Sequence, residues 1–289
     1  MSNGTGHLFG GDWTQEKLRM LRNYLREYTK IMAKQPFTFG YIDAFAGAGY
    51  IRAEEAIENE TSLFPGFDDE ESKKFLQGSV QTALEVEPPF QKYVFIEKDA
   101  KSFQELTKIK QKYPRKEIDL VNTDANEWLL DSCDKDWTSH RAVVFLDPYG
   151  MQVKWETMEA IAKTKAIDVW ILFPLGIGAN RLLKRRGNLP PEWEEKLNEL
   201  LGTVEWKKRF YESNPTLFGG ESRNKTIDLQ GIGNFYNERL KEIFEQVADN
   251  PRPLYNSRNN PMYLFCFAAA NPKGGPTAVR IARHILKNA

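Results

Sequence analysis

The sequence predicts an α/β fold built on a mainly parallel, doubly wound sheet. Five short apolar runs rich in Val, Ile and Phe have the length of buried strands: FGYIDAF (39–45), KYVFIEK (92–98), EIDLVN (117–122), AVVFLDP (142–148) and IDVWILFPL (167–175). Segments with helical periodicity, such as 100–112 and 155–164, lie between these runs. Unbroken apolar strands that alternate with helices are typical of parallel sheets covered on both faces.

An amphipathic helix precedes the first strand. Its start shows a capping pattern, Asp12 with Gln15, and apolar residues then recur at helical spacing at Leu18, Leu21, Leu25, Tyr28 and Met32. We expect this helix to pack against the sheet. The last elements are a strand, MYLFCFAAA (262–270), and a helix that starts near Pro276.

Two stretches interrupt the alternation of strands and helices. Residues 51–77 are acidic and rich in loop-forming residues, which predicts a surface insertion. Residues 181–258 are rich in Lys, Arg, Trp and Asn and are too long for an ordinary connection. We therefore predict a Rossmann-like cofactor-binding and catalytic domain, 1–180 together with 259–289, and a helical cap over 181–258 for substrate or partner.

Composition limits the function classes. The 289 residues can bury a substantial core, and the formal net charge is zero, so nucleic acid could be attracted only by a local patch. No apolar stretch approaches the ~20 residues that a membrane span needs, and a secretory signal pattern is missing. Cys133 and Cys266 lie far apart without metal-binding spacing. We expect a soluble cytoplasmic protein with reduced thiols and no metal site.

Acidic residues follow three consecutive predicted strands. Asp43 ends the first strand and is followed by Gly47 and Gly49, Glu97 ends the second, and Asp124 follows the third. Ligands of doubly wound sheets bind beyond the carboxyl ends of the strands, where a glycine turn lets them approach the backbone. The sequence therefore predicts a nucleoside site at this edge. Alternatively, Asp43 and Glu97 are solvated strand ends, and Asp124 caps the helix that follows it.

The glycine pattern favours S-adenosylmethionine over NAD. A dinucleotide site needs a third glycine that opens a helix, and this spacing lacks one. Asp43 would repel a phosphate but suits the ammonium group of S-adenosylmethionine. Glu97 could accept hydrogen bonds from the ribose hydroxyls and Asp124 from the adenine amine. Phe45 completes the predicted cofactor-binding set with Gly47 and Gly49.

The fourth predicted strand ends in the loop Asp147, Pro148, Tyr149 and Gly150. An Asp-Pro-aromatic sequence at this place resembles the active-site loop of amino-methyltransferases. Hydrogen bonds from an exocyclic amine to Asp147 and a carbonyl near Pro148 would localise the nitrogen lone pair, while Tyr149 stacks on the ring. The loop departs from Asp-Pro-Pro-Tyr, and Asp-Pro-Tyr-Gly also occurs in guanine-N2 tRNA methyltransferases, so it does not specify adenine. The alternative is a turn capped by Asp147.

The chain as a whole resembles the three-Cys-motif partner family. The matching motifs run from residue 7 to about residue 183: HLFGGDWTQEKLRMLRNYLREY, YIDAFAGAG, GSVQTALEVEPPFQKYVFIEKD, FLDPYG and FPLGIGANRLL. The resemblance implies a class I methyltransferase fold in a bacterial or phage-associated protein. It also implies a partner, a three-cysteine-motif protein similar to radical S-adenosylmethionine enzymes.

The predicted cap carries basic and aromatic residues. A basic cluster follows the fifth strand: Arg181, Lys184, Arg185 and Arg186. The segment VEWKKRFYESN (204–214) then interleaves three aromatic residues, Trp206, Phe210 and Tyr211, with basic ones. Such residues could contact phosphates and stack on bases, or anchor a protein partner, or simply form solvated helix faces. Two functions follow: methyl transfer to an exocyclic amine of a nucleobase in nucleic acid, or a cofactor-binding subunit that positions or regulates the three-cysteine protein.

Overall fold

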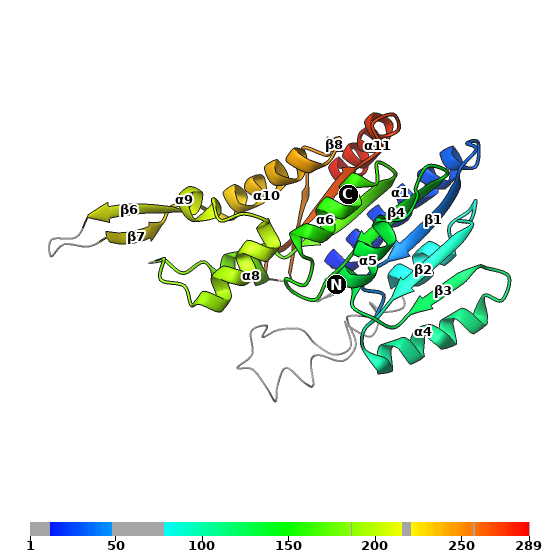
Figure 1. The fold of residues 1–289 in the computed structure, drawn as a ribbon, viewed down its shortest axis with the longest axis horizontal. Helices are drawn as coiled ribbons and strands as arrows, with labels where there is room; N and C mark the ends of the chain where they lie inside the picture. The colour runs from blue at the N-terminus through cyan, green and yellow to red at the C-terminus, as the bar shows by residue number, and fades with distance from the viewer. Residues whose placement is uncertain (1–11, 48–77, 186, 216–220, 257, 289) are drawn as a thin grey trace, which may run out of the picture.

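The computed structural model describes residues 12–47, 78–185, 187–215, 221–256 and 258–288 (Figure 1). The insertion predicted over 51–77 and the glycine at position 49 lie outside the described residues, as does Arg186. Among the described residues, a helix with the length and apolar character needed to cross a membrane is not found.

The main element is an eight-stranded sheet with the order β3-β2-β1-β4-β5-β10-β8, in which β9 also pairs with β10. Strands β1 to β5 are parallel, whereas β10 is antiparallel to its neighbours. The strands are β1 (Thr38–Asp43), β2 (Lys92–Ile96), β3 (Ile118–Val121), β4 (His140–Leu146), β5 (Ile167–Phe173), β8 (Gln246–Val247), β9 (Arg252–Tyr255) and β10 (Pro261–Ala269). This arrangement confirms the predicted Rossmann-like fold of class I methyltransferases. Strand order reverses between β1 and β4, where such sheets bind ligands.

Helices cover both faces of the sheet, because alternate strand residues point to opposite sides and both sets are apolar. One face packs against α1 (Asp12–Met32), a helix over 78–84, α4 (Ala100–Lys112) and α11 (Gly275–Lys287). The other face, toward the viewer in Figure 1, packs against α5 (Ala125–Cys133), α6 (Trp155–Lys163) and α10 (Leu229–Ile243).

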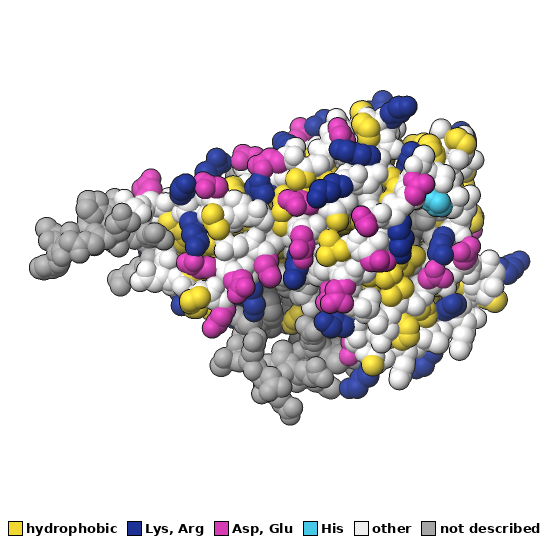
Figure 2. Space-filling view, in the orientation of Figure 1, with side chains coloured by type: hydrophobic (Ala, Val, Ile, Leu, Met, Phe, Trp, Pro, Cys, Tyr) yellow, Lys and Arg dark blue, Asp and Glu magenta, His cyan; other side chains and the backbone are white. Residues whose placement is uncertain are grey.

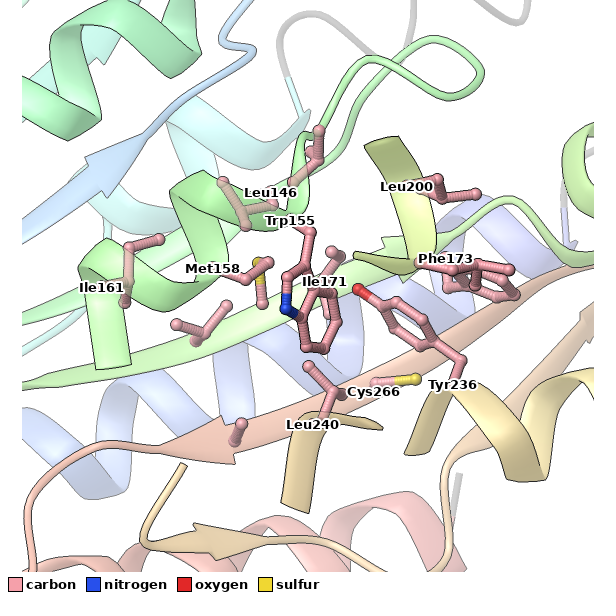
Figure 3. Close-up of a cluster of buried hydrophobic side chains, with 14 of the residues drawn as sticks. Leu146, Trp155, Met158, Ile161, Ile171, Phe173, Leu200, Tyr236, Leu240 and Cys266 are labelled. Atoms are coloured by element: carbon pink, nitrogen blue, oxygen red, sulfur yellow. The ribbon is translucent and has the colours of Figure 1, made fainter. Parts of the chain in front are cut away.

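An aromatic cluster joins α6 and α10 to the sheet (Figure 3). The rings of Phe173 and Tyr236 stack with centroids 4.0 Å apart, and Trp155 meets Tyr236 edge-on at 6.2 Å. Cys266 is buried in the same cluster, and burial raises the pKa of its thiol. Cys133 and Cys266 are both free thiols. This packing fixes α6 and α10 on β5 and β10, near the edge where the parallel strands end.

The segment predicted as a helical cap is only partly helical. After β5 come the short π-helix η1 (Leu175–Ala179), α7 (Asn180–Leu182), α8 (Pro191–Leu201) and α9 (Trp206–Phe210). Strands β6 (Tyr211–Pro215) and β7 (Glu221–Lys225) form a hairpin at the left end of Figure 1. The rest of the segment belongs to the main sheet and its covering helices. Helix α10 covers the sheet, and both β8 and β9 pair with β10. The division into two domains stays a prediction.

Candidate functional site

The parallel strands bring the predicted acidic residues to one edge of the sheet. Asp43 is the last residue of β1, while Glu97 and Asp147 directly follow β2 and β4. In the register of β1 with β4, Asp43 lies level with Phe145, two residues before Asp147. The two carboxylates therefore flank the point where the strand order reverses.

Asp43 is fully buried. Its Oδ2 accepts a hydrogen bond from the Tyr41 hydroxyl at 3.3 Å, whereas its Oδ1 has no hydrogen-bond partner among the described residues. Burial raises the pKa of Asp43 to about 7; Ser79, Tyr41 and the backbone of Phe45 oppose this rise, while the negative charge of Asp147 adds to it. A buried carboxylate oxygen without a partner is costly in free energy, so Asp43 could accept a cationic or hydrogen-bond-donating ligand.

Gly47, Glu97 and Ser102 pack closely beside Asp43. A Cβ atom at position 47 would lie 2.7 Å from Oε2 of Glu97 and 2.6 Å from Cβ of Ser102, so the site admits only glycine without rearrangement. Oε1 of Glu97 accepts a hydrogen bond from the backbone N–H of Asp99 at 2.6 Å. Oε2 of Glu97 and Oγ of Ser102 are buried without partners in the described part of the chain. Burial raises the pKa of Glu97.

Asp124 serves as the N-cap of α5, the alternative that the sequence left open. Its Oδ1 accepts a hydrogen bond from the backbone N–H of Asn126 at 2.9 Å, and its Oδ2 pairs with Nζ of Lys98 at 3.2 Å. Burial alone would raise the pKa of Asp124, but the bonds from Lys98 and Asn126 outweigh it and lower the pKa. An adenine amine bound by Asp124 would therefore have to share this carboxylate with Lys98 and the backbone of Asn126.

Asp147 forms a buried ion pair with a residue that sequence reasoning did not include in the site. Nζ of Lys17, in α1, donates a hydrogen bond to Oδ2 of Asp147 at 2.7 Å, with exposed side-chain fractions of 0% and 8%. Burial raises the pKa of Asp147, and Lys17 opposes that rise. Burial lowers the pKa of Lys17, against the attraction of Asp147 and then Asp43. The sequence does contain a sign that Lys17 is buried. Lys17 is four residues before Leu21 and therefore lies on the apolar face of α1.

The loop after Asp147 has the geometry that its residue types suggest. Pro148 is buried, and Gly150 has a φ of 74°, a left-handed conformation that favours glycine. Oε1 of Gln152 accepts a hydrogen bond from the backbone N–H of Tyr149 at 3.1 Å, and the Tyr149 side chain is half-buried. Phe45, also half-buried, packs against the core on the α5 and α6 face.

The predicted basic cluster follows β5 and η1. Arg181, Lys184 and Arg185 are exposed, and Nζ of Lys184 lies 4.7 Å from the ring centroid of Trp193. The backbone of this cluster is tied to the hairpin, because the carbonyl of Lys184 accepts a hydrogen bond from the Tyr211 hydroxyl at 2.9 Å. On the face shown in Figure 2, basic and acidic side chains are interspersed.

The expectation that Trp206, Phe210 and Tyr211 stack on bases or anchor a partner is wrong. Trp206 and Phe210 are fully buried and Tyr211 is 6% exposed, because the apolar side of α9 packs on the core. Nε1 of Trp206 also donates a hydrogen bond to Oδ1 of Asn198 at 2.8 Å. The intervening basic residues form ion pairs: Lys207 with Glu194, Lys208 with Glu205, and Arg209 with Glu238.

The described residues include no candidate metal site. The described residues contain no group of three or more His, Cys, Asp or Glu side chains that could hold a metal ion. His140 and His284 are exposed, and His7 lies outside the described residues.

Neither a family model nor a curated protein matches the chain. Among solved structures, LPL1258 of Legionella pneumophila shares 14% identity over 98% of this chain and 92% of its own, with a TM-score of 0.48. A protein of Escherichia coli named as a candidate methyltransferase, yhhF, shares 13% identity over 70% and 85%, with a TM-score of 0.31. HI0767 of Haemophilus influenzae, a candidate methylase by name, shares 13% over 71% and 85%, with a TM-score of 0.28. The fold assignment therefore depends on the strand order itself, and membership of the three-Cys-motif partner family stays a prediction.

Proposed function

We propose that this protein is an S-adenosylmethionine-dependent methyltransferase that acts on an exocyclic amine of a nucleobase carried by nucleic acid. The observation that carries the proposal is the buried carboxylate of Asp147. It directly follows β4 at the switch point of the sheet, in an Asp-Pro-Tyr-Gly loop, and lies near Asp43. The same edge holds oxygens of Asp43 and Glu97 that have no hydrogen-bond partner among the described residues.

The residues at this edge fit the cofactor. Oε2 of Glu97 and Oγ of Ser102 are polar atoms without partners among the described residues, and the lack of a side chain at Gly47 lets its backbone lie directly against both residues. Glu97 and Ser102 would hold the ribose, and Asp43 the ammonium group. When bound, S-adenosylmethionine supplies an electrophilic methyl group on a sulfonium.

Asp147 would act on the substrate amine. An aromatic exocyclic amine is a weak nucleophile because its lone pair is delocalised into the ring. A hydrogen bond from the amine to the Asp147 carboxylate draws electron density back to the nitrogen and orients the lone pair. Tyr149, which is half-buried in the same loop, would stack on the base, and the basic cluster at Arg181 and Lys184 would contact phosphates.

The test uses labelled S-adenosylmethionine with separate pools of DNA, tRNA and total protein. We expect label to enter one nucleic-acid pool. Asp147→Asn should reduce transfer by ~100-fold or more while cofactor affinity stays within a few fold, because the residue addresses the substrate. Asp168→Asn is the matched control, since Asp168 is also a buried carboxyl but lies at the opposite end of the sheet, at the start of β5.

Two results would contradict the proposed function. If S-adenosylmethionine does not bind to the unmodified protein, the cofactor assignment fails. If the cofactor binds but label enters no pool until a three-cysteine-motif protein is added, the partner-subunit function replaces the proposed one.

A further inference from the structure

The N-terminal helix α1 places a positive charge at the candidate catalytic carboxylate. Lys17 is completely buried, its Nζ lies 2.7 Å from Oδ2 of Asp147, and it also lies 5.2 Å and 5.8 Å from the ring centroids of Trp13 and Phe145. Among the described residues, the hydrogen bond that acts on the Asp147 carboxylate is the one from Lys17 to Oδ2. One oxygen of the carboxylate is thus held by α1, and the other is the remaining acceptor.

The surroundings of Asp147 are otherwise unfavourable for a negative charge. Asp43 and Tyr41 face it from β1 and Tyr263 faces it from β10, so Lys17 is the one cation that the described residues place against it. Without Lys17, a buried carboxylate would lie beside a second carboxylate and two phenols. It would then bind a proton more readily, and a protonated carboxyl is a weaker hydrogen-bond acceptor for the substrate amine than a carboxylate.

Helix α1 has other contacts with the rest of the protein besides this ion pair. The hydroxyl of Tyr24 donates a hydrogen bond to Oδ2 of Asp168 at 2.6 Å, and Arg252 pairs with Glu16 at 2.8 Å. The apolar face of α1 is buried against the sheet as well. Replacing a whole buried ion pair with apolar residues is often neutral for stability, whereas removing Lys17 alone leaves the charge of Asp147 without its partner, so the pair matters for the charge state of Asp147 more than for the docking of α1.

We propose that Lys17 is a positioning residue for the methyl-transfer reaction, which keeps Asp147 ionised and oriented by binding Oδ2, so that Oδ1 accepts the hydrogen bond from the substrate amine. This inference rests on the proposed function. It makes α1 part of the active site and not only a cover for the sheet.

The experiment compares Lys17→Met and Lys17→Gln with Tyr24→Phe. The control removes the other buried hydrogen bond between α1 and a carboxylate, far from the site. The first readout is the pH titration of the Asp147 carboxyl carbon by ¹³C NMR, assigned with Asp147→Asn. In the Lys17 variants the carboxyl should titrate at higher pH than in the unmodified protein, whereas Tyr24→Phe should leave it unchanged.

The second readout is kcat for methyl transfer as a function of pH. Lys17→Met and Lys17→Gln should lower kcat about tenfold or more, with the acid limb moved to higher pH and cofactor affinity within a few fold. If the Asp147 carboxyl titrates identically in all variants, or if the Lys17 variants keep the normal acid limb, the proposal is overturned. If the unmodified protein transfers no methyl group, the proposed function fails, and the NMR titration alone decides whether Lys17 controls Asp147.

Discussion

Replacing Gly47 with alanine should weaken cofactor binding more than it weakens the fold. The added Cβ would lie 2.6 Å from Cβ of Ser102, roughly 1 Å closer than normal contact between carbon atoms. It would also lie 2.7 Å from Oε2 of Glu97. Neither neighbour moves freely, because Glu97 is held by the backbone N–H of Asp99 at 2.6 Å and Ser102 belongs to the first turn of α4.

Two costs follow from this overlap. Overpacking a filled site destabilises a protein by about 1–3 kcal/mol, which should appear as a modest fall in the melting temperature. Displacing Glu97 removes hydrogen bonds to a charged acceptor worth about 1.5–3 kcal/mol, so S-adenosylmethionine should bind about tenfold to a hundredfold more weakly. Isothermal titration calorimetry and thermal unfolding measure the two effects separately.

Gly40→Ala is the control, because it makes the same substitution inside β1, away from the edge where Gly47 follows the strand. A Cβ there would lie 3.2 Å from the carbonyl oxygen of Lys92, an overlap that a shift of a few tenths of an ångström removes. Its cofactor affinity should stay unchanged. Wild-type affinity in Gly47→Ala, in a protein that is still folded, would refute the assignment of Gly47 and Glu97 to the cofactor site.

Three further predictions concern stability and the surface. Burial raises the pKa of Asp168 to about 7. Between pH ~4 and pH ~7 the folded state therefore keeps a proton that the unfolded state has released. As pH rises through this range, the free energy of unfolding should fall by up to about 1.4 kcal/mol per pH unit. Denaturant titrations at several pH values should show a smaller slope for Asp168→Asn. Trp206→Ala should cost about 3–5 kcal/mol of stability because the ring is fully buried, whereas Tyr255→Ala, at a 45% exposed position, should change it by less than about 0.5 kcal/mol. Replacing Arg181 and Lys184 together with alanine should flatten the slope of log affinity for nucleic acid against log salt by about 1.4–1.8, and an unchanged slope would make them solvated surface residues.

The sequence by itself determined the layer architecture and the edge of the sheet that carries the candidate site. Strands β1, β2, β4 and β5 are buried on both faces over most of their length, so each appears as an unbroken apolar run between helical segments, whereas the edge strand β3 is only partly buried. Because parallel strands end at one edge, Asp43, Glu97 and Asp147 could be grouped without knowledge of any contact. Gly47 was recognisable as part of a Gly-x-Gly turn after the first strand, and the structure shows that a side chain there would overlap Glu97 and Ser102.

Only the tertiary structure decided which side chains meet across the sequence. Lys17 and Asp147 are 130 residues apart, and helical periodicity shows that Lys17 lies on the buried face of α1 but not what it faces. The same limit applies to Trp206, whose place in a short basic helix is compatible with an exposed or a buried ring until the packing partner is known. Strand β8 is two residues long, too short to form a pattern, and exists because β10 offers it a hydrogen-bonding edge. Charge state depends on burial and neighbouring charges, which are properties of the assembled fold and not of local sequence.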